Sequence, residues 1–270
     1  MATCIENAIE IAHAAGALTR QFFERRVQFE LKGEYDLVTE ADRASERLIV
    51  SRLKELYPEH AIMAEEGGGH ESSSGYRWYV DPLDGTTNFA HGYPVWNVTL
   101  ALEKDGEIVL GVVFDPVRNE LFTAEKGAGA WLNGRRIYTS KSRQMNEALF
   151  STGFPSRRRH LDVNIYFYYQ LAMASHGVRR GGSAAIDLAY VACGRLDGYW
   201  EFSLSPWDMA AGKLLVTEAG GGCTTMDGEP HALTSRHIFA SNGLIHDEAL
   251  ARFREIFNGE YRYALPAMSR

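Results

Sequence analysis

The sequence predicts a layered protein of mixed α+β and α/β character, in which helices pack against β-sheets in alternation. Two observations lead to this prediction. In the first half of the chain, amphipathic helices precede strands joined by tight turns, whereas in the second half strands and helices alternate. We therefore divide the 270 residues into an N-terminal α+β region, 1–142, with an antiparallel sheet, and a C-terminal α/β region, 143–270. The boundary falls in the polar stretch near residues 140–146.

The individual elements follow from hydrophobic periodicity and from turn residues. Residues at helical spacing predict an amphipathic helix over 2–24, with one face formed by Ile5, Ile9, Ala12, Gly16 and Thr19 or Arg20. Thr39 can cap a second helix that ends before Pro58. Asp105-Gly106 between two apolar runs indicates a hairpin. These patterns predict strands at 60–64, 78–80, 97–103, 107–114, 120–124, 130–132, 148–152, near 178, 196–202 and 237–241, and later helices at about 160–175, 183–193, 206–219 and 246–257.

Net charge, cysteine content and the N-terminal residues argue against several classes of protein. A net charge of −7 argues against general binding to nucleic acid or to anionic membranes. The three cysteines are too few and too scattered for a disulfide framework or a zinc site, and they fit a reducing cytosol. Glu6 and Glu10 lie among the apolar residues of the N-terminus, which is therefore neither a signal peptide nor a membrane span. We expect a cytoplasmic protein with no membrane segment.

The most informative segment is residues 81–89, which read Asp-Pro-Leu-Asp-Gly-Thr-Thr-Asn-Phe. The preceding aromatic and β-branched run predicts a buried strand, which should stop at Pro82 because proline cannot donate to a ladder. Asp81 and Asp84 would then lie in a stiff turn, and the residues from Gly85 onward would open a helix with free N–H groups for an anion. Mg²⁺ prefers oxygen ligands and binds through a few carboxylates and substrate phosphate oxygens. The segment therefore predicts a place where cations and a phosphate meet.

An ordinary turn and two other phosphate-binding motifs fit this segment less well. Asp-Pro and Asp-Gly pairs are common in ordinary turns, but a plain turn needs neither two acids nor two threonines. Phosphatases with an aspartyl nucleophile place their two acids two residues apart, whereas Pro82 and Thr86 occupy the positions two before and two after Asp84. A P-loop would require a Gly-Lys-Ser/Thr ending, which the chain does not contain.

Further carboxylates are needed, because each Mg²⁺ ion takes six oxygen ligands. Glu65 ends a strand that would neighbour Asp81, although a Glu-Glu pair is more often a solvated loop. Asp208 lies in the first turn of a helix, where it could simply complement the helix dipole. Asp42 follows Thr39 by three residues and could serve only as a capping-box partner.

Two further residues could contact the rest of a substrate. Ser183 opens a helix after two glycines, where backbone N–H groups and a hydroxyl could bind an anion or a hydroxylated ligand. The alternative is that Ser183 is only an N-cap. Glu201 ends a predicted strand and would point into the same crevice, or else lie on its rim.

The chain resembles the inositol monophosphatase family, bacterial type, over nearly its whole length. The segment 81–89 and the run Pro206-Trp207-Asp208-Met209-Ala210-Ala211-Gly212 are similar to the family's paired signature. Shorter blocks also resemble the family: Asp36-Leu37-Val38-Thr39 with Asp42, Ala64-Glu65-Glu66, Gly182-Ser183-Ala184-Ala185, Gly194-Arg195-Leu196-Asp197 and Thr217-Glu218-Ala219-Gly220-Gly221.

The resemblance implies a five-layer α-β-α-β-α sandwich, a homodimer, and Mg²⁺-dependent, lithium-sensitive hydrolysis of a phosphate monoester, with two or three ions and with Mn²⁺ able to substitute. The implied metal ligands are Glu65, Asp81, Asp84, Asp208 and the carbonyl of Leu83. Asp42 and Thr86 would position the attacking water beside Glu65. The implied substrate contacts are the N–H groups of Gly85 and Thr86 for the phosphate, and Ser183, Ala184, Glu201 and Asp208 for the alcohol.

The substrate stays open at this point. Myo-inositol 1-phosphate is the first expectation, and fructose 1,6-bisphosphate, histidinol phosphate and a 3′-phosphonucleotide are alternatives within the same family. A regulatory protein that binds the transcription machinery is an alternative of another class, for which the basic runs 157–160 and 179–180 would be relevant, although a solvated face is the simpler interpretation. The loop 32–36 is short, as in bacterial members, which leaves its part in a third metal site open.

Overall fold

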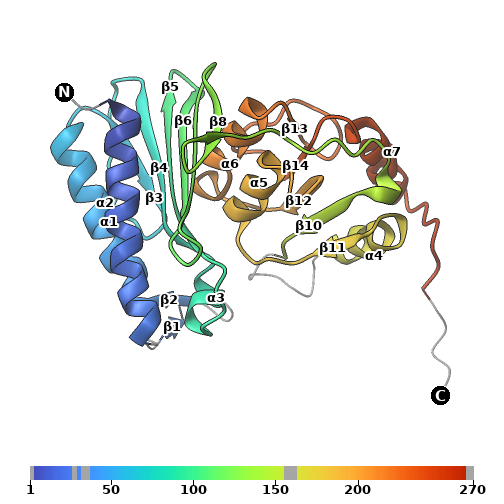
Figure 1. Ribbon diagram of the computed structural model, residues 1–270, viewed down its shortest axis with the longest axis horizontal. Helices are drawn as coiled ribbons and strands as arrows, with labels where there is room; N and C mark the ends of the chain where they lie inside the picture. The colour runs from blue at the N-terminus through green and yellow to red at the C-terminus, as the bar shows by residue number, and fades with distance from the viewer. Residues whose placement is uncertain (1–2, 26–28, 32–36, 155–162, 266–270) are drawn as a thin grey trace.

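The computed structural model describes residues 3–25, 29–31, 37–154 and 163–265, which form five alternating layers of helix and sheet (Figure 1). Helices α1 (Cys4–Arg25) and α2 (Glu40–Leu56) cover one face of a seven-stranded sheet. Helices α5 (Ala184–Ala192) and α6 (Pro206–Glu218) lie between this sheet and a five-stranded sheet. Helices α4 (Asn164–Ala174) and α7 (His246–Phe257) cover the far face of the second sheet. The predicted α-β-α-β-α sandwich is confirmed.

The seven-stranded sheet is antiparallel except for its first pair. Only β3 and β4 run parallel. Asp105 and Gly106 both have positive φ, 50° and 85°, in the tight turn between β5 and β6, as the hairpin prediction requires. The strand order is β3 (Ala61–Ala64), β4 (Tyr76–Asp84), β5 (Asn97–Lys104), β6 (Glu107–Asp115), β7 (Glu120–Glu125), β8 (Gly129–Leu132) and β9 (Arg135–Arg136).

The five-stranded sheet is mixed. Its first three strands run parallel and are connected by helices, as the alternation in the sequence predicted, and β14 is antiparallel to both of its neighbours. The strand order is β11 (Gly177–Arg179), β10 (Leu149–Thr152), β12 (Gly198–Phe202), β14 (His237–Ser241) and β13 (Gly222–Thr224). The short strand β13 was not predicted. Whether residues 1–142 and 143–270 are separate domains stays a prediction, because α5 and α6 share one hydrophobic core with both sheets.

Strand β4 shows how the central layers are held. Trp78 and Val80 pack into the core beneath α1 and α2, and Tyr79 between them packs into the core around α5 and α6. Successive side chains of a strand point to opposite faces, so a sheet covered on both faces has apolar residues at every position. Strand β4 is thereby covered by helices on both faces and carries Asp81 and Asp84 at its C-terminal end.

The prediction that this strand stops at Pro82 was wrong. Strand β4 continues to Asp84, and its register against β5 shifts between Asp81 and Asp84. Proline can lie at such an irregularity because no ladder hydrogen bond is required there. Asp81 and Asp84 are therefore the last residues of a bulged strand and do not lie in a turn beyond it.

The predicted apolar face of the first helix is confirmed in part. Ala12, Gly16 and Thr19 are buried as expected, whereas Ile5 and Ile9 are only partly buried against the same core. The buried face also includes three residues that were not predicted, Ala8, Ile11 and Ala15. The second helix begins after Thr39 and ends at Leu56, as predicted.

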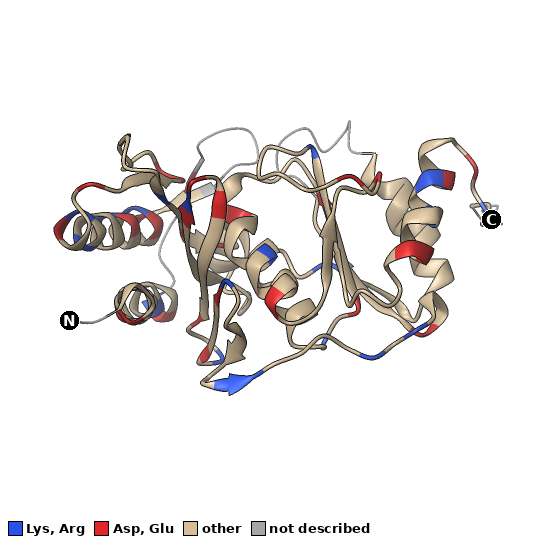
Figure 2. Cartoon of the chain, turned by 90° about the horizontal axis from the view of Figure 1, so that it is seen from above, with Lys and Arg blue, Asp and Glu red and all other residues tan. Residues whose placement is uncertain are grey.

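Several short elements complete the described part of the fold. Strands β1 (Phe29–Leu31) and β2 (Leu37–Thr39) form an unpredicted antiparallel pair, and the short helices α3 (Thr86–Ala90) and η1 (Met145–Glu147) lie in connections. The predicted loop 32–36 and the basic run 157–160 lie outside the described residues. No helix in the described ranges is long and apolar enough to cross a membrane. Acidic and basic residues lie side by side along the outer helices α1 and α2 (Figure 2).

Candidate active site

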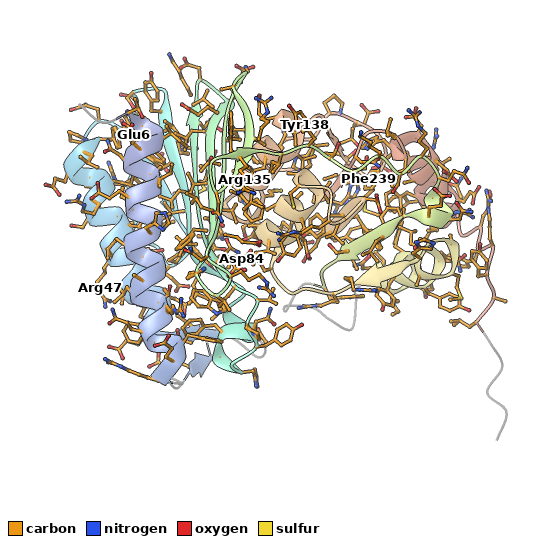
Figure 3. The ribbon with its side chains drawn as sticks, viewed as in Figure 1. Glu6, Arg47, Asp84, Arg135, Tyr138 and Phe239 are labelled. Carbon is orange, nitrogen blue, oxygen red and sulfur yellow. The ribbon has the colours of Figure 1, made fainter. Side chains whose placement is uncertain are left out.

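Three separate chain segments bring acidic side chains to one place. Asp81 and Asp84 are at the end of β4, and Glu65 follows β3, which runs parallel to β4 with Ala64 opposite Val80. The Glu65 N–H donates to the Val80 carbonyl at 3.2 Å, so Glu65 lies beside Asp81. Asp208 enters from the first turn of α6 in the layer beneath. Figure 3 shows Asp84 between the seven-stranded sheet and the second half of the chain.

The four carboxylates are close enough for their charges to act on one another. Asp81 is 2% exposed, and burial raises its pKa well above the usual range, with further increases from the charges of Glu65, Asp84 and Asp208. Burial also raises the pKa of Asp208 well above its usual range, and the next largest cause is Asp84. Buried like charges hold protons unless a cation compensates them. The place where these acids approach one another is therefore suited to positive charge.

The donor chemistry fits a hard divalent cation. The charged groups that raise the pKa of Asp81 are all carboxylates, those of Glu65, Asp84 and Asp208. Within the described ranges, no three Asp, Glu, His or Cys side chains meet closely enough to form a complete metal centre on their own. Mg²⁺ usually binds through one or two carboxylates, waters and substrate phosphates, so such a cage is not required. Glu65, Asp81, Asp84, Asp208 and the Leu83 carbonyl remain predicted ligands.

Asp84 is held by a network that connects the two halves of the chain. Its Oδ2 accepts hydrogen bonds from Asn97 Nδ2 at 2.9 Å, Ser183 Oγ at 2.7 Å and the Ala185 N–H at 2.9 Å. The first turn of α5, which was expected to bind an anion, thus binds the Asp84 carboxylate. Ser183 is also the N-cap of α5, since its Oγ accepts from the Ile186 N–H at 3.3 Å. A contact between Ser183 or Ala184 and a substrate alcohol stays a prediction.

Asp42 caps α2 and also contacts Thr86, while a part for Asp42 in positioning water stays a prediction. Its Oδ2 accepts from the Thr39 N–H at 2.8 Å, which completes a capping box at the start of α2. Its Oδ1 accepts from Thr86 Oγ1 at 2.9 Å, and that same hydroxyl lies 3.1 Å from the Leu83 carbonyl oxygen. Asp42 is fully buried, and burial raises its pKa. One acid therefore fixes the helix start and orients Thr86 beside the end of β4.

Gly85 makes the sharp change of direction from β4 into α3. Its φ of 96° is in the left-handed region, and an added Cβ would lie 2.9 Å from the Val95 carbonyl oxygen. Only glycine adopts this conformation in this space at low cost. The N–H groups of Gly85 and Thr86 are at the start of α3, where the first N–H groups of a helix lack intrahelical partners. Phosphate binding by these two groups stays a prediction.

Glu201 lies on the other side of the crevice, on β12. Its Oε2 accepts from the Tyr199 hydroxyl at 2.5 Å, and it is 8% exposed. The charge of Glu201 is among the causes that raise the pKa of Asp208, after burial and Asp84. Glu201 therefore lies close enough to Asp208 for their charges to interact.

Sequence reasoning missed two residues here. Asp187 in α5 has a pKa raised well above the usual range, by burial first and then by Glu201. Asn97, at the start of β5, donates to both Asp84 and Ser183, at 2.9 and 2.8 Å. The sequence pattern does not distinguish either residue from an ordinary polar residue beside an apolar run.

Comparisons with known proteins identify the family. The family model described as the inositol monophosphatase family matches residues 1–257. An inositol-1-monophosphatase from Synechocystis is 47% identical over 249 residues, covering 91% of this chain and 87% of that protein. A protein named Nus factor SuhB from Pseudomonas aeruginosa is 46% identical over 250 residues, covering 90% of this chain and 92% of that protein.

A solved structure agrees with these sequence relatives. The inositol monophosphatase from Anabaena superimposes with a TM-score of 0.85 at 40% identity, covering 93% of this chain and 95% of that one. The acids at the ends of β3 and β4 and at the start of α6 thus occur in a fold shared with a protein of that name. The chain belongs to the inositol monophosphatase family.

Proposed function

We propose that this protein hydrolyses a phosphate monoester in a Mg²⁺-dependent reaction, with myo-inositol 1-phosphate as the substrate. Family membership supports a phosphatase. The observation that carries the metal dependence is the buried Asp81, whose pKa is raised by burial and then by Glu65, Asp84 and Asp208. A buried carboxylate that is already affected by the charges of three other acids is a poor neighbour for a phosphate dianion unless cations lie between them.

The first proposed role of this chain's residues is to bind the metal ions. Glu65, Asp81, Asp84, Asp208 and the Leu83 carbonyl would hold two or three Mg²⁺ ions, or Mn²⁺ in their place. Bound Mg²⁺ supplies an acidified water and neutralises charge on the phosphate and the leaving oxygen. No cysteine or histidine nucleophile is required.

Thr86 and Asp42 would position the attacking water. When the Thr86 hydroxyl donates its one hydrogen bond to Asp42 Oδ1, at 2.9 Å, its lone pairs are left to accept a hydrogen bond from a water molecule. The N–H groups of Gly85 and Thr86 would hold the phosphate oxygens. Ser183, Ala184, Glu201 and Asp208 would contact the alcohol, for which the buried Glu201 carboxylate favours a substrate with several hydroxyl groups.

A phosphate-release assay over a panel of substrates tests this proposal. We expect phosphate release from inositol 1-phosphate with Mg²⁺ or Mn²⁺, none after chelation, and slower release from fructose 1,6-bisphosphate, histidinol phosphate and 3′-phosphoadenosine 5′-phosphate. A faster reaction with one of the other three would reassign the substrate. Full activity after exhaustive chelation would contradict the metal dependence.

A second function is favoured by one comparison. The Pseudomonas relative is named Nus factor SuhB, which favours a regulatory role for this chain in a transcription complex. Arg179 and Arg180 are exposed and available for such a contact. A pull-down of transcription factors by the wild type and by Asp84→Asn would separate the two roles, since binding that survives loss of phosphatase activity would not depend on catalysis. A cytoplasmic homodimer is the proposed state of the protein in either role.

A further inference from the structure

We propose that Glu46 is a positioning residue for Glu65, because its carboxylate fixes the loop that carries Glu65 into the crevice. The inference rests on the proposed function for Glu65 as a metal ligand. Glu46 is on α2, is 5% exposed, and is not among the family blocks that point to the site.

The Glu46 carboxylate binds the loop after β3 at two points. Its Oε2 accepts from the Glu66 N–H at 2.7 Å, and its Oε1 accepts from the Gly68 N–H at 2.8 Å. Hydrogen bonds from backbone N–H groups to a carboxylate are charge-assisted and stronger than neutral ones. Two such bonds within three residues fix the path of the backbone immediately after Glu65.

Gly68 makes this close approach possible. A Cβ added to Gly68 would lie 2.7 Å from Glu46 Oε1, closer than real Cβ contacts. The Glu65–Gly68 loop is also attached to the sheet, because the Glu65 N–H donates to the Val80 carbonyl at 3.2 Å. The loop is therefore held by β4 at Glu65 and by α2 at Glu66 and Gly68.

Other side chains of helix α2 also form hydrogen bonds to segments that carry candidate site residues. Asp42 and Glu46 are four residues apart and therefore share a helix face. Ser45, adjacent to Glu46, donates from Oγ to the Pro82 carbonyl at 2.8 Å, at the bulge between Asp81 and Asp84. Successive polar side chains of one helix thus contact the Thr86 segment, the end of β4 and the Glu65 loop. Such support is what keeps metal ligands in place before the metal binds.

The expected loss of Mg²⁺ affinity follows from the role of Glu46 as a partner of a metal-ligand loop. Outer partners of metal ligands typically contribute 10- to 100-fold to metal affinity. Glu46→Gln keeps the size of the side chain but replaces one accepting oxygen by an amide that faces a backbone N–H. We expect Mg²⁺ affinity to fall about tenfold or more, and high Mg²⁺ to restore kcat with little change in KM for the phosphate ester.

The experiment measures Mg²⁺ binding to the substrate-free protein by titration calorimetry, together with amide hydrogen exchange of residues 65–68. Glu55→Gln is the matched control, since Glu55 is on the same helix and its side chain is 67% exposed beside Arg52. We expect weaker Mg²⁺ binding and faster exchange of the Glu66 and Gly68 amides in Glu46→Gln, with the control equal to the wild type.

The outcomes separate this inference from the proposed function. Equal Mg²⁺ affinity in the wild type and in Glu46→Gln overturns the role of Glu46 alone. Absence of Mg²⁺ binding in the wild type overturns the proposed function and this inference with it. If Glu46→Gln does not fold, Gly68→Ala takes its place, because the new Cβ pushes against Glu46 Oε1. Unchanged Mg²⁺ affinity in folded Gly68→Ala would also overturn the inference.

Discussion

Removing the charge of Asp208 is the perturbation that discriminates best between its two possible roles. Its Oδ2 accepts from the Ser205 N–H at 2.7 Å and thereby caps α6, while its pKa is raised by burial and then by Asp84. Asp208→Asn keeps an oxygen for the cap and removes the charge. Asp208→Ala removes both. The two variants therefore separate the capping role from the proposed metal role.

Mass action gives the expected stabilisation by ligand, and helix capping gives the expected change in stability without ligand. With Mg²⁺ and phosphate at a hundredfold excess over Kd, the wild type should gain about 2.7 kcal/mol, which is roughly 5–10 °C in Tm. A tenfold loss of affinity at the same concentrations leaves about 1.4 kcal/mol, about half of that shift. Without ligand, loss of the cap should cost Asp208→Ala up to about 1 kcal/mol, partly offset by the relief of repulsion. Asp208→Asn should be at least as stable as the wild type.

Paired thermal melts, with and without Mg²⁺ plus phosphate, measure both effects. Asp197→Asn is the control, because Asp197 is also a buried aspartate and accepts from the Leu149 N–H at 2.6 Å. Asp197 directly precedes the first residue of β12, whereas Glu201 is near the last residue of that strand. It should lower the Tm and leave the ligand-induced shift intact. An undiminished shift in Asp208→Asn would place Asp208 outside the metal site and leave only its capping role.

Three further predictions concern charge and metal. Asp84→Asn should stay folded and lose about 10²-fold or more in turnover; more than half the activity at saturating Mg²⁺ would contradict its role. Asp81 has a higher pKa in the folded protein than in the unfolded chain, where it has the ordinary value of 3.8. Between these two pKa values the folded protein holds a proton on Asp81 that the unfolded chain has released. Metal-free stability should therefore fall as pH rises through that window, and a flat Tm between about pH 4 and about pH 8 would refute this. Uncompetitive inhibition by Li⁺ in the millimolar range is expected in initial-rate assays, which unchanged rates would exclude.

Much of the fold could be predicted because local rules and tertiary packing agree. The long helix α1, the hairpin at Asp105-Gly106 and the alternation in the second half all have clear periodicity or turn residues. Three-residue strands such as β1, β2 and β13 were missed because they are too short to show a period. Pro82 misled the prediction because a strand can continue past a proline at a bulge, which depends on its neighbour's register.

The candidate site could also be predicted only in part, because some of its residues are recognisable only from their tertiary contacts. The acids of residues 81–84 could be found because two carboxylates so close together are unusual in a plain turn. Asn97, Glu46 and Asp187 could not, because a buried polar residue looks like a surface one until its partners are known. The alternatives weighed for Asp42 and Ser183, cap or site, were both too narrow, since each residue caps a helix and also contacts a site residue.

The most direct test of the central claim is a crystal structure of this protein with Mn²⁺ and phosphate, analysed by anomalous scattering of Mn²⁺. The account predicts Mn²⁺ within bonding distance of the carboxylates of Asp81, Asp84 and Asp208, a second ion at Glu65, and phosphate between the ions and the start of α3. Mn²⁺ bound elsewhere, in a protein that still releases phosphate in a metal-dependent reaction, would contradict it.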